Sequence, residues 1–161
     1  MSSHAARWTA GGLALAALLV VTQDARSAGS RIIEPTQMGC QYRGSENGDR
    51  GFEPQSAEPC DQLDAEAGSE RPAEAEVLKL EPGTCTFRVS HAEVPYEHGF
   101  WIRQADCQLG KPVHKLTETS VSGGAVFTGQ TKDYELELER GEYVYSCPLD
   151  PIAGYKLGIE G

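Results

Sequence analysis

The sequence predicts an all-β domain, an antiparallel β-sandwich or small barrel, over residues 75–161. Three observations lead to this prediction. Short segments alternate between apolar and polar residues with the period of two that is typical of half-buried strands. Glycine and proline turn signals separate these segments. No stretch of this part of the chain shows a clear helical period.

The first predicted strands lie on either side of a tight turn. Residues 77–80 (VLKL) precede the turn signal EPG, and residues 84–89 (TCTFRV) follow it with the cysteine, phenylalanine and valine on one face. Residues 98–103 (HGFWIR) alternate in the same way, with the histidine, phenylalanine and isoleucine in phase. The SGG at 122–124 predicts a loop before the apolar residues 125–127.

The clearest alternation lies in the second half of the domain. Residues 133–139 (DYELELE) have apolar side chains on one face and acidic side chains on the other. The turn signal RGE leads into residues 143–147 (YVYSC), in which Cys147 is in phase with two tyrosines. A last short strand is expected at 155–159. We therefore expect Cys147 at the end of the penultimate strand.

The first 28 residues are typical of an export signal. Arg7 supplies a positive charge, residues 11–21 form an apolar run, and ARSA at 25–28 offers small residues for cleavage. This run is shorter than the roughly 20 residues that a membrane-spanning helix needs, although a retained membrane anchor is the alternative. The sequence therefore predicts an exported protein, periplasmic or secreted, with no membrane span after cleavage.

Residues 29–74 differ sharply in composition from the predicted domain. Between residues 41 and 76, ten acidic residues accompany three arginines, and small residues and prolines fill most other positions. Such a segment offers little apolar surface to offset the entropy lost when a chain becomes ordered. We therefore expect residues 29–74 to be an acidic, poorly ordered N-terminal extension.

Five cysteines remain after removal of the signal, and the oxidising compartments that exported proteins reach favour disulfides. An odd count leaves at least one cysteine outside any bridge within a monomer. Sequence does not fix the connectivity, but the local solution joins Cys40 to Cys60 and Cys85 to Cys107. Cys147 is then the remaining thiol.

The charge of the chain argues against nucleic acid as a partner. The chain has 14 basic and 24 acidic residues, a net charge of −10. Loss of Arg7, Arg26 and Asp24 with the signal leaves 12 basic and 23 acidic residues, a net charge of −11. Such a surface repels nucleic acid and anionic lipid, keeps the protein soluble and attracts basic partners. The chain also has no GxSxG elbow and no phosphate-binding glycine loop, so we do not predict an enzyme.

Three stretches of the domain form a familiar set. They are LEPGTCTFRV at 80–89 followed by a loop to His98, GEYVYSC at 141–147, and the loop from Cys147 to the last strand. Together they resemble the cupredoxins, small copper proteins such as plastocyanin, amicyanin and nitrosocyanin. The resemblance covers residues 75–161 and implies an antiparallel Greek-key β-sandwich with a copper site at one end.

The resemblance also implies which residues bind the copper. Cys147 and His98 keep the ligand types of the family. Asp150 stands three residues after the cysteine, where the family has a second histidine, and Tyr155 stands where it has an axial methionine. Carboxylate and phenol form a harder donor set that favours Cu(II) and lowers the reduction potential. We predict Cys147, His98 and Asp150 as metal ligands.

Each of these residues has an alternative structural role. Asp150 is also suited to cap a turn, and Tyr155 to pack in the core. His98 is alternatively a solvated loop histidine, and Cys147 a small buried apolar residue. His91, Glu93 and Glu97 are additional candidate donors in the segment expected to cover the same end, or else a turn histidine and two solvated carboxylates.

The residues and the resemblance together predict an exported copper-binding protein that is not an enzyme. It would transfer electrons to a redox partner protein or handle copper. The alternative is a metal-free module of the same fold with a binding or accessory role, because a fold alone does not fix a function. The missing second histidine and methionine favour this alternative.

Overall fold

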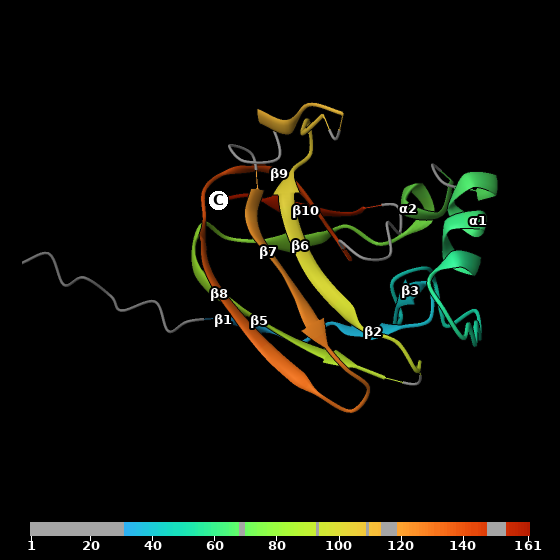
Figure 1. Ribbon diagram of the computed structural model, residues 1–161. Coiled ribbons are helices and arrows are strands. Elements are labelled where there is room, and N and C mark those ends of the chain that lie inside the picture. Colours follow the sequence, from blue (N-terminus) through green and yellow to red (C-terminus); the bar gives the residue numbers. More distant parts are fainter. Residues whose placement is uncertain (1–30, 68–69, 93, 109, 114–118, 148–153) are drawn as a thin grey trace, which may run out of the picture.

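The computed structural model of the chain describes residues 31–67, 70–92, 94–108, 110–113, 119–147 and 154–161. The expected signal at 1–28 lies outside them. So do the candidate ligand Asp150 and the additional candidate donor Glu93. In the described residues, ten strands form two five-stranded sheets. The sheets pack face to face as a sandwich, shown in Figure 1.

The first sheet is built around its longest strand. Its members are β1 (Arg31–Ile33), β2 (Thr36–Met38), β3 (Gln41–Tyr42), β5 (Gly83–His91) and β8 (Thr131–Leu138). Strand β8 runs antiparallel to β5 along its whole length. On the other edge of β5, strands β1 and β2 follow one another and run parallel to it. Pro35, which has no N–H to donate, lies between these two short strands.

The second sheet contains the C-terminal strands. Its members are β4 (Leu78–Leu80), β6 (His98–Gln104), β7 (Thr119–Val126), β9 (Gly141–Ser146) and β10 (Tyr155–Ile159). Their order across the sheet is β4-β10-β9-β6-β7. All neighbours are antiparallel except β4 and β10. The all-β, antiparallel Greek-key sandwich predicted from the sequence is confirmed, with parallel pairs at the sheet edges.

The predicted alternation is what fills the core. In β8 Tyr134, Leu136 and Leu138 are buried while the residues between them are exposed. In β5 buried residues alternate with half-buried ones, and β6 alternates in this way after three buried residues at its start. Burial of these apolar faces supplies most of the favourable free energy of folding. The buried core consists of Tyr42, Ala75, Leu80, Cys85, Phe87, Val89, Phe100, Ile102, Tyr134, Leu136, Leu138, Tyr143, Tyr145, Tyr155, Leu157 and Ile159.

The loop predicted at 122–124 is wrong, because these residues lie inside β7. The two glycines of that stretch weaken a strand but do not forbid one. Gly123 pairs with Phe100 of β6, next to a register shift between the two strands. The glycine pair therefore marks an irregularity within a strand rather than its end.

The acidic segment also differs from the expectation. We expected residues 29–74 to be poorly ordered and the domain to begin at residue 75, but β1, β2 and β3 are part of the first sheet. Helices α1 (Glu58–Ala67) and α2 (Glu70–Glu74) follow and lie together on the side of β3 (Figure 1). Tyr42 of this segment belongs to the main core. The folded unit therefore includes most of the segment that composition assigned to an extension.

One of the two expected disulfides is present. Cys40 and Cys60 form a bridge with Cα atoms 5.0 Å apart, which fastens α1 to the turn between β2 and β3. The expected bridge between Cys85 and Cys107 is wrong, because neither cysteine is in a disulfide. Cys85 lies within β5 of the first sheet, whereas Cys107 follows β6 of the second. Cys147, as expected, forms no disulfide.

Candidate metal site

Three strand ends bring potential ligands to one end of the sandwich. Strand β5 ends at His91 and β6 begins at His98, and these two residues face each other from the two sheets. Strand β9 runs antiparallel to β6, with Ser146 paired to Trp101, so the residue after Ser146 lies beside the start of β6. That residue is Cys147.

The two histidines form a buried pair. Their ring centroids are 4.1 Å apart, with an interplanar angle of 71°. His91 is 2% exposed and His98 is 1% exposed. None of the four ring nitrogens has a hydrogen-bond partner among the described residues. Buried polar atoms are rarely left in this state, and a bound metal ion or water is a usual explanation.

The sulfur of Cys147 lies against the residue that follows His98. The backbone N–H of Gly99 donates a hydrogen bond to Cys147 Sγ over 3.3 Å. Cys147 itself is 1% exposed. A backbone N–H that points at sulfur stabilises the negative charge of a thiolate, which is the form that binds metals. Cys147 Sγ therefore lies beside the backbone of the residue that follows His98.

The backbone holds the end of β5 in place. Gly129 adopts a φ of +77°, a conformation that favours glycine, and its N–H donates to His91 O over 2.9 Å. The N–H of His91 in turn donates to Gln130 O over 3.0 Å. These bonds close the turn into β8 and fix the position from which the His91 side chain enters the sandwich.

A tyrosine from the loop before β6 packs against His98. The Tyr96 ring lies 4.8 Å from the His98 ring, and its hydroxyl contacts Cys60 Sγ over 3.6 Å. Cys60 is part of the disulfide to Cys40. The N-terminal segment therefore reaches the candidate site through its disulfide.

Burial keeps both imidazoles neutral. Removal from water lowers the pKa of His98 to about 3, and the neighbouring His91 contributes to the shift. Burial also lowers the pKa of His91, and the nearby backbone of Phe127, outside hydrogen-bond geometry, opposes this shift. A neutral imidazole has a lone pair free for a metal ion. At neutral pH both rings are therefore in the form required of a ligand.

These shifts predict that the metal-free protein loses stability in mild acid. In the unfolded chain His98 binds a proton below a pH of about 6.5, whereas in the fold it does so only near its pKa of about 3. The unfolded state then holds the extra proton, so the free energy of unfolding falls as the pH falls, by up to about 1.4 kcal/mol per pH unit. Urea denaturation between about pH 7 and 4.5 measures this slope. His98→Leu should flatten it, and an equal slope in both proteins would contradict the shift.

The residue at the expected axial position does not face the histidines. Tyr155 is buried at the start of β10 and donates its hydroxyl hydrogen to Glu46 Oε1. Its ring packs against Tyr42 and Tyr145 at centroid distances of 5.5 Å each. Of its two proposed roles, the structure places Tyr155 in the core. Asp150, which the resemblance gave as a ligand, lies outside the described residues.

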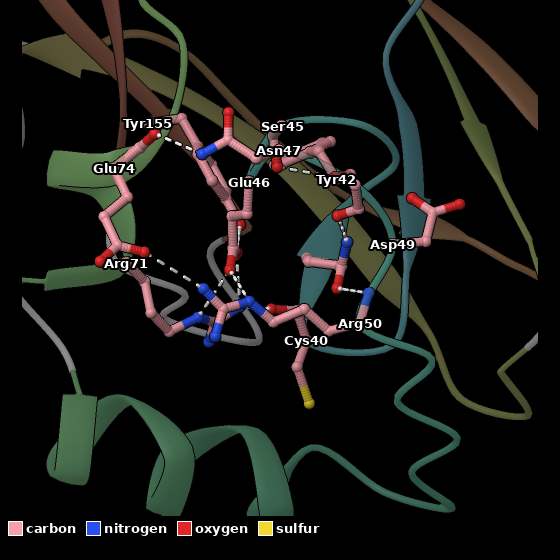
Figure 2. A network of polar contacts seen from close by, with 12 residues as sticks. Cys40, Tyr42, Ser45, Glu46, Asn47, Asp49, Arg50, Arg71, Glu74 and Tyr155 are labelled. Atoms are coloured by element: carbon pink, nitrogen blue, oxygen red, sulfur yellow. Dashed lines mark hydrogen bonds and ion pairs between the residues drawn. The ribbon is translucent and has the colours of Figure 1, made fainter.

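Glu46 is the centre of a buried ionic network, shown in Figure 2. Arg71 donates to both of its carboxylate oxygens over 2.6 and 3.2 Å and to Cys40 O over 2.6 Å. Arg50 reaches Glu46 Oε2 over 2.8 Å. Burial alone would raise the pKa of Glu46, but the hydrogen bonds from Arg71 and Tyr155 and the two arginine charges lower it. The network ties the N-terminal segment to β10.

The donor atoms present suit copper, although the described residues hold no completed cluster. Two neutral imidazoles and a thiol are the ligand types of a Cu(I)/Cu(II) electron-transfer site. The four imidazole nitrogens have no hydrogen-bond partner among the described residues, so their lone pairs are available to a ligand. Within the described part of the chain, no three or more His, Cys, Asp or Glu side chains are arranged as a ready metal site. The types of these residues therefore fit a copper ion.

His91 is the residue whose importance the sequence analysis underestimated. It was named there only as an additional donor or a turn histidine. Its signal was its phase, because it follows Cys85, Phe87 and Val89 at intervals of two and all four are buried. A histidine that continues the core face of a strand points into the sandwich. The imidazole that lies beside His98 therefore comes from β5 of the first sheet.

No helix among the described residues is long and apolar enough to cross a membrane.

No family model matches the chain, and no curated protein matches it. Solved structures do match. Reduced auracyanin from Roseiflexus castenholzii matches with a TM-score of 0.51 and 11% identity, over 82% of this chain and 98% of that one. Auracyanin B matches with a TM-score of 0.50 and 7% identity, over 81% and 89%.

Auracyanin A from Chloroflexus aurantiacus, described as a "blue" copper protein, also matches, with a TM-score of 0.48 and 13% identity over 82% of this chain and all of that one. At sequence identities this low, structural similarity establishes a common fold and not a common function. The fold that the motifs of the sequence suggested is thus found again by comparison of structures. The chain has the cupredoxin β-sandwich fold.

Proposed function

We propose that this chain is an exported cupredoxin that binds a copper ion through Cys147, His98 and His91. The observation that carries the proposal is the histidine pair, whose four buried nitrogens have no partner among the described residues. Cys147 Sγ adds a soft donor beside the pair, because it accepts a hydrogen bond from the N–H of Gly99, the residue after His98. This combination of donors is selective for copper over hard cations such as Mg²⁺ or Ca²⁺.

The function that we propose is electron transfer or copper handling without an enzymatic reaction. A bound copper ion supplies a one-electron couple between Cu(I) and Cu(II). The protein residues contribute a buried, preorganised set of donors. The neutral imidazoles need lose no proton to bind, and the Gly99 N–H partly offsets the negative charge on sulfur. Burial of His98 and Cys147 limits access of water to them.

Asp150 remains a predicted oxygen ligand in this proposal. Its position in the loop after Cys147 is carried over from the resemblance, and a turn cap is its alternative role. With His91 as the second imidazole, a carboxylate would be the fourth and hardest donor. Its presence would lower the reduction potential by favouring Cu(II).

Two further parts of the proposal concern the surroundings of the protein. The signal-like first 28 residues support export to the periplasm or beyond. The net charge of −10 favours a redox partner with a basic surface and disfavours nucleic acid. The partner itself is left open by the sequence.

Titration of the signal-free protein with Cu(II) tests the proposal. We expect an intense visible absorption band from thiolate to copper and about one copper per chain after dialysis. Cys147→Ser should abolish the band because serine offers no thiolate. Cys85→Ser is the matched control, because Cys85 is also buried and outside any disulfide but lies within β5. A band that survives Cys147→Ser, or is lost equally in both variants, would contradict the assignment.

The second candidate function is a metal-free binding or accessory module. The observation in its favour is that the described residues do not contain a ready cluster of three or more metal donors. If the wild-type chain shows no band and retains no copper, this candidate is the better account.

A further inference from the structure

Gln37 stands out among the buried polar residues that the proposed site does not use. It lies in β2, within the segment that composition assigned to a disordered extension, and is 2% exposed. A buried amide side chain costs stability unless its hydrogen bonds are satisfied. The partners of Gln37 therefore indicate what the residue does.

Its side-chain nitrogen has two partners, whereas its Oε1 has none among the described residues. Gln37 Nε2 donates to Gly99 O over 2.5 Å and to Tyr42 Oη over 2.9 Å. Burial raises the pKa of Tyr42 well above its usual value, so this phenol stays neutral and holds its own hydrogen. Gly99 O needs a donor, and the N–H groups of Gln37 provide it. The requirement of Gly99 O for a donor therefore fixes which way the side-chain amide of Gln37 points.

Gly99 is held from both sides. Its N–H donates to Cys147 Sγ over 3.3 Å, and its C=O accepts from Gln37. Gly99 has no side chain whose packing could restrict its backbone, so these two bonds add to the strand pairing of β6 in holding its peptide planes. The N–H and C=O of Gly99 belong to consecutive peptide planes joined at its Cα, so loss of the bond from Gln37 removes one restraint on the backbone that presents the N–H to sulfur.

The backbone of Gln37 is joined to the other histidine. Gln37 pairs with His91 in the parallel register of β2 and β5. Gln37 O accepts the N–H of Ala92, the next residue, over 2.9 Å. The same residue therefore contacts both strands that supply the imidazoles, through its backbone on one side and its side chain on the other.

We propose that Gln37 is a positioning residue for the candidate metal site, because it holds Gly99 in the orientation in which the Gly99 N–H donates to Cys147 Sγ. In this role the N-terminal segment supplies the outer support of the site. The effect on bound copper rests on the proposed function. The effect on Gly99 does not, since it is a property of the metal-free chain.

The test compares Gln37→Met with Gln41→Met. Methionine nearly conserves the volume of glutamine and removes its amide group. Gln41 is a matched control because it lies four residues on, is 1% exposed, and uses its side chain for Gly48 O over 3.2 Å and the Arg50 N–H over 3.0 Å. Its bonds lie outside the site. Both substitutions thus remove a buried amide from the same hairpin.

The first readout is amide hydrogen exchange at Gly99 in the metal-free protein. We expect Gln37→Met to speed exchange at Gly99 about five- to tenfold relative to Ile102, the size expected for one lost hydrogen bond. Gln41→Met should leave this ratio unchanged. An unchanged ratio in Gln37→Met, or the same rise in both variants, would overturn the proposal.

The second readout is the thiolate-to-copper band after addition of Cu(II). Gln37→Met should shift the band, because the charge on sulfur is less stabilised, while Gln41→Met should leave its position unchanged. A band unmoved in Gln37→Met would overturn the role at the metal. If the wild type shows no band, the proposed function fails, and exchange at Gly99 alone decides the role of Gln37.

A third variant covers the case in which Gln37→Met does not fold. Gln37→Glu has the same size, and its ionised carboxylate cannot donate to Gly99 O. We expect faster exchange at Gly99 in this variant above the pKa of the new carboxyl group and partial recovery below it, where the protonated group donates again. Exchange at Gly99 equal to that of the wild type throughout would overturn the proposal.

Discussion

Arg71→Met is expected to destabilise the metal-free protein by about 3 kcal/mol, the lower end of the range for breaking one side of a buried ion pair. Arg71 is buried and makes four hydrogen bonds, to Glu46, Asp64 and Cys40 O. Methionine preserves much of its volume but leaves the Glu46 carboxylate short of a charge partner. Arg50, which is 40% exposed in its side chain, keeps its contact with Glu46 and limits the loss.

Urea denaturation at neutral pH with the disulfide intact measures this effect. Arg88→Met is the control, because Arg88 also makes a bidentate pair, with Asp133, at 2.9 Å for both bonds, but on the exposed faces of β5 and β8. Exposed pairs contribute little since water screens them. Glu46→Gln combined with Arg71→Met should recover part of the loss. If Arg71→Met and Arg88→Met lowered the free energy of unfolding equally, the buried network would not stabilise the packing of the N-terminal segment.

His91→Ala is expected to weaken Cu(II) binding by at least about a hundredfold. Loss of a residue that only hydrogen-bonds to a metal ligand weakens metal binding by up to about a hundredfold, and loss of a ligand itself should cost at least as much. In the proposed site His91 supplies one of the two imidazoles, and its ring lies 4.1 Å from that of His98. Asp150→Ala should have a smaller effect, a shifted thiolate band with copper retained, because the three proposed donors Cys147, His98 and His91 remain in this variant.

Competition titration with a chelator of known affinity measures both variants. The His91 and His98 variants should lose affinity to a similar degree, since both rings are buried and without hydrogen-bond partners in the described residues. The ligand set is wrong if His91→Ala binds copper as the wild type does while Asp150→Ala does not. In that case the loop position given by the resemblance would be the third ligand.

The sequence predicted the sandwich because its core follows simple periodicity. Residues 133–139 alternate without interruption, and the structure buries Tyr134, Leu136 and Leu138 accordingly. The same argument placed His98 and Cys147 on core-facing positions at strand ends. Period-two patterns fix which face a residue occupies, so the positions of these two side chains could be inferred without knowledge of the pairing of strands.

The N-terminal segment was not predictable from composition. Counting acidic residues treats each as solvated, yet Glu46 is buried because Arg71 and Arg50 neutralise it. Strands as short as β2 and β3 also carry no periodic signal. Their place in the first sheet depends on β5, which is distant in the sequence. Such pairings require the tertiary structure.

The candidate site was predictable in part for the same reason. His98 and Cys147 follow from motif and phase, whereas the role of His91 depends on which strand of the opposite sheet faces β6. The sequence pattern places His91 on the core face of β5 but does not say that this face meets His98. The resemblance pointed instead to the loop after Cys147, where Asp150 stands.

X-ray absorption spectroscopy at the copper edge tests the central claim most directly, because it counts the atoms bound to the ion. The account predicts one sulfur and two imidazole nitrogens in the copper-loaded wild type. His91→Ala should leave one imidazole, and Cys147→Ser should remove the sulfur. A wild-type spectrum without sulfur, or with a single imidazole that persists in His91→Ala, would contradict a site formed by His91, His98 and Cys147.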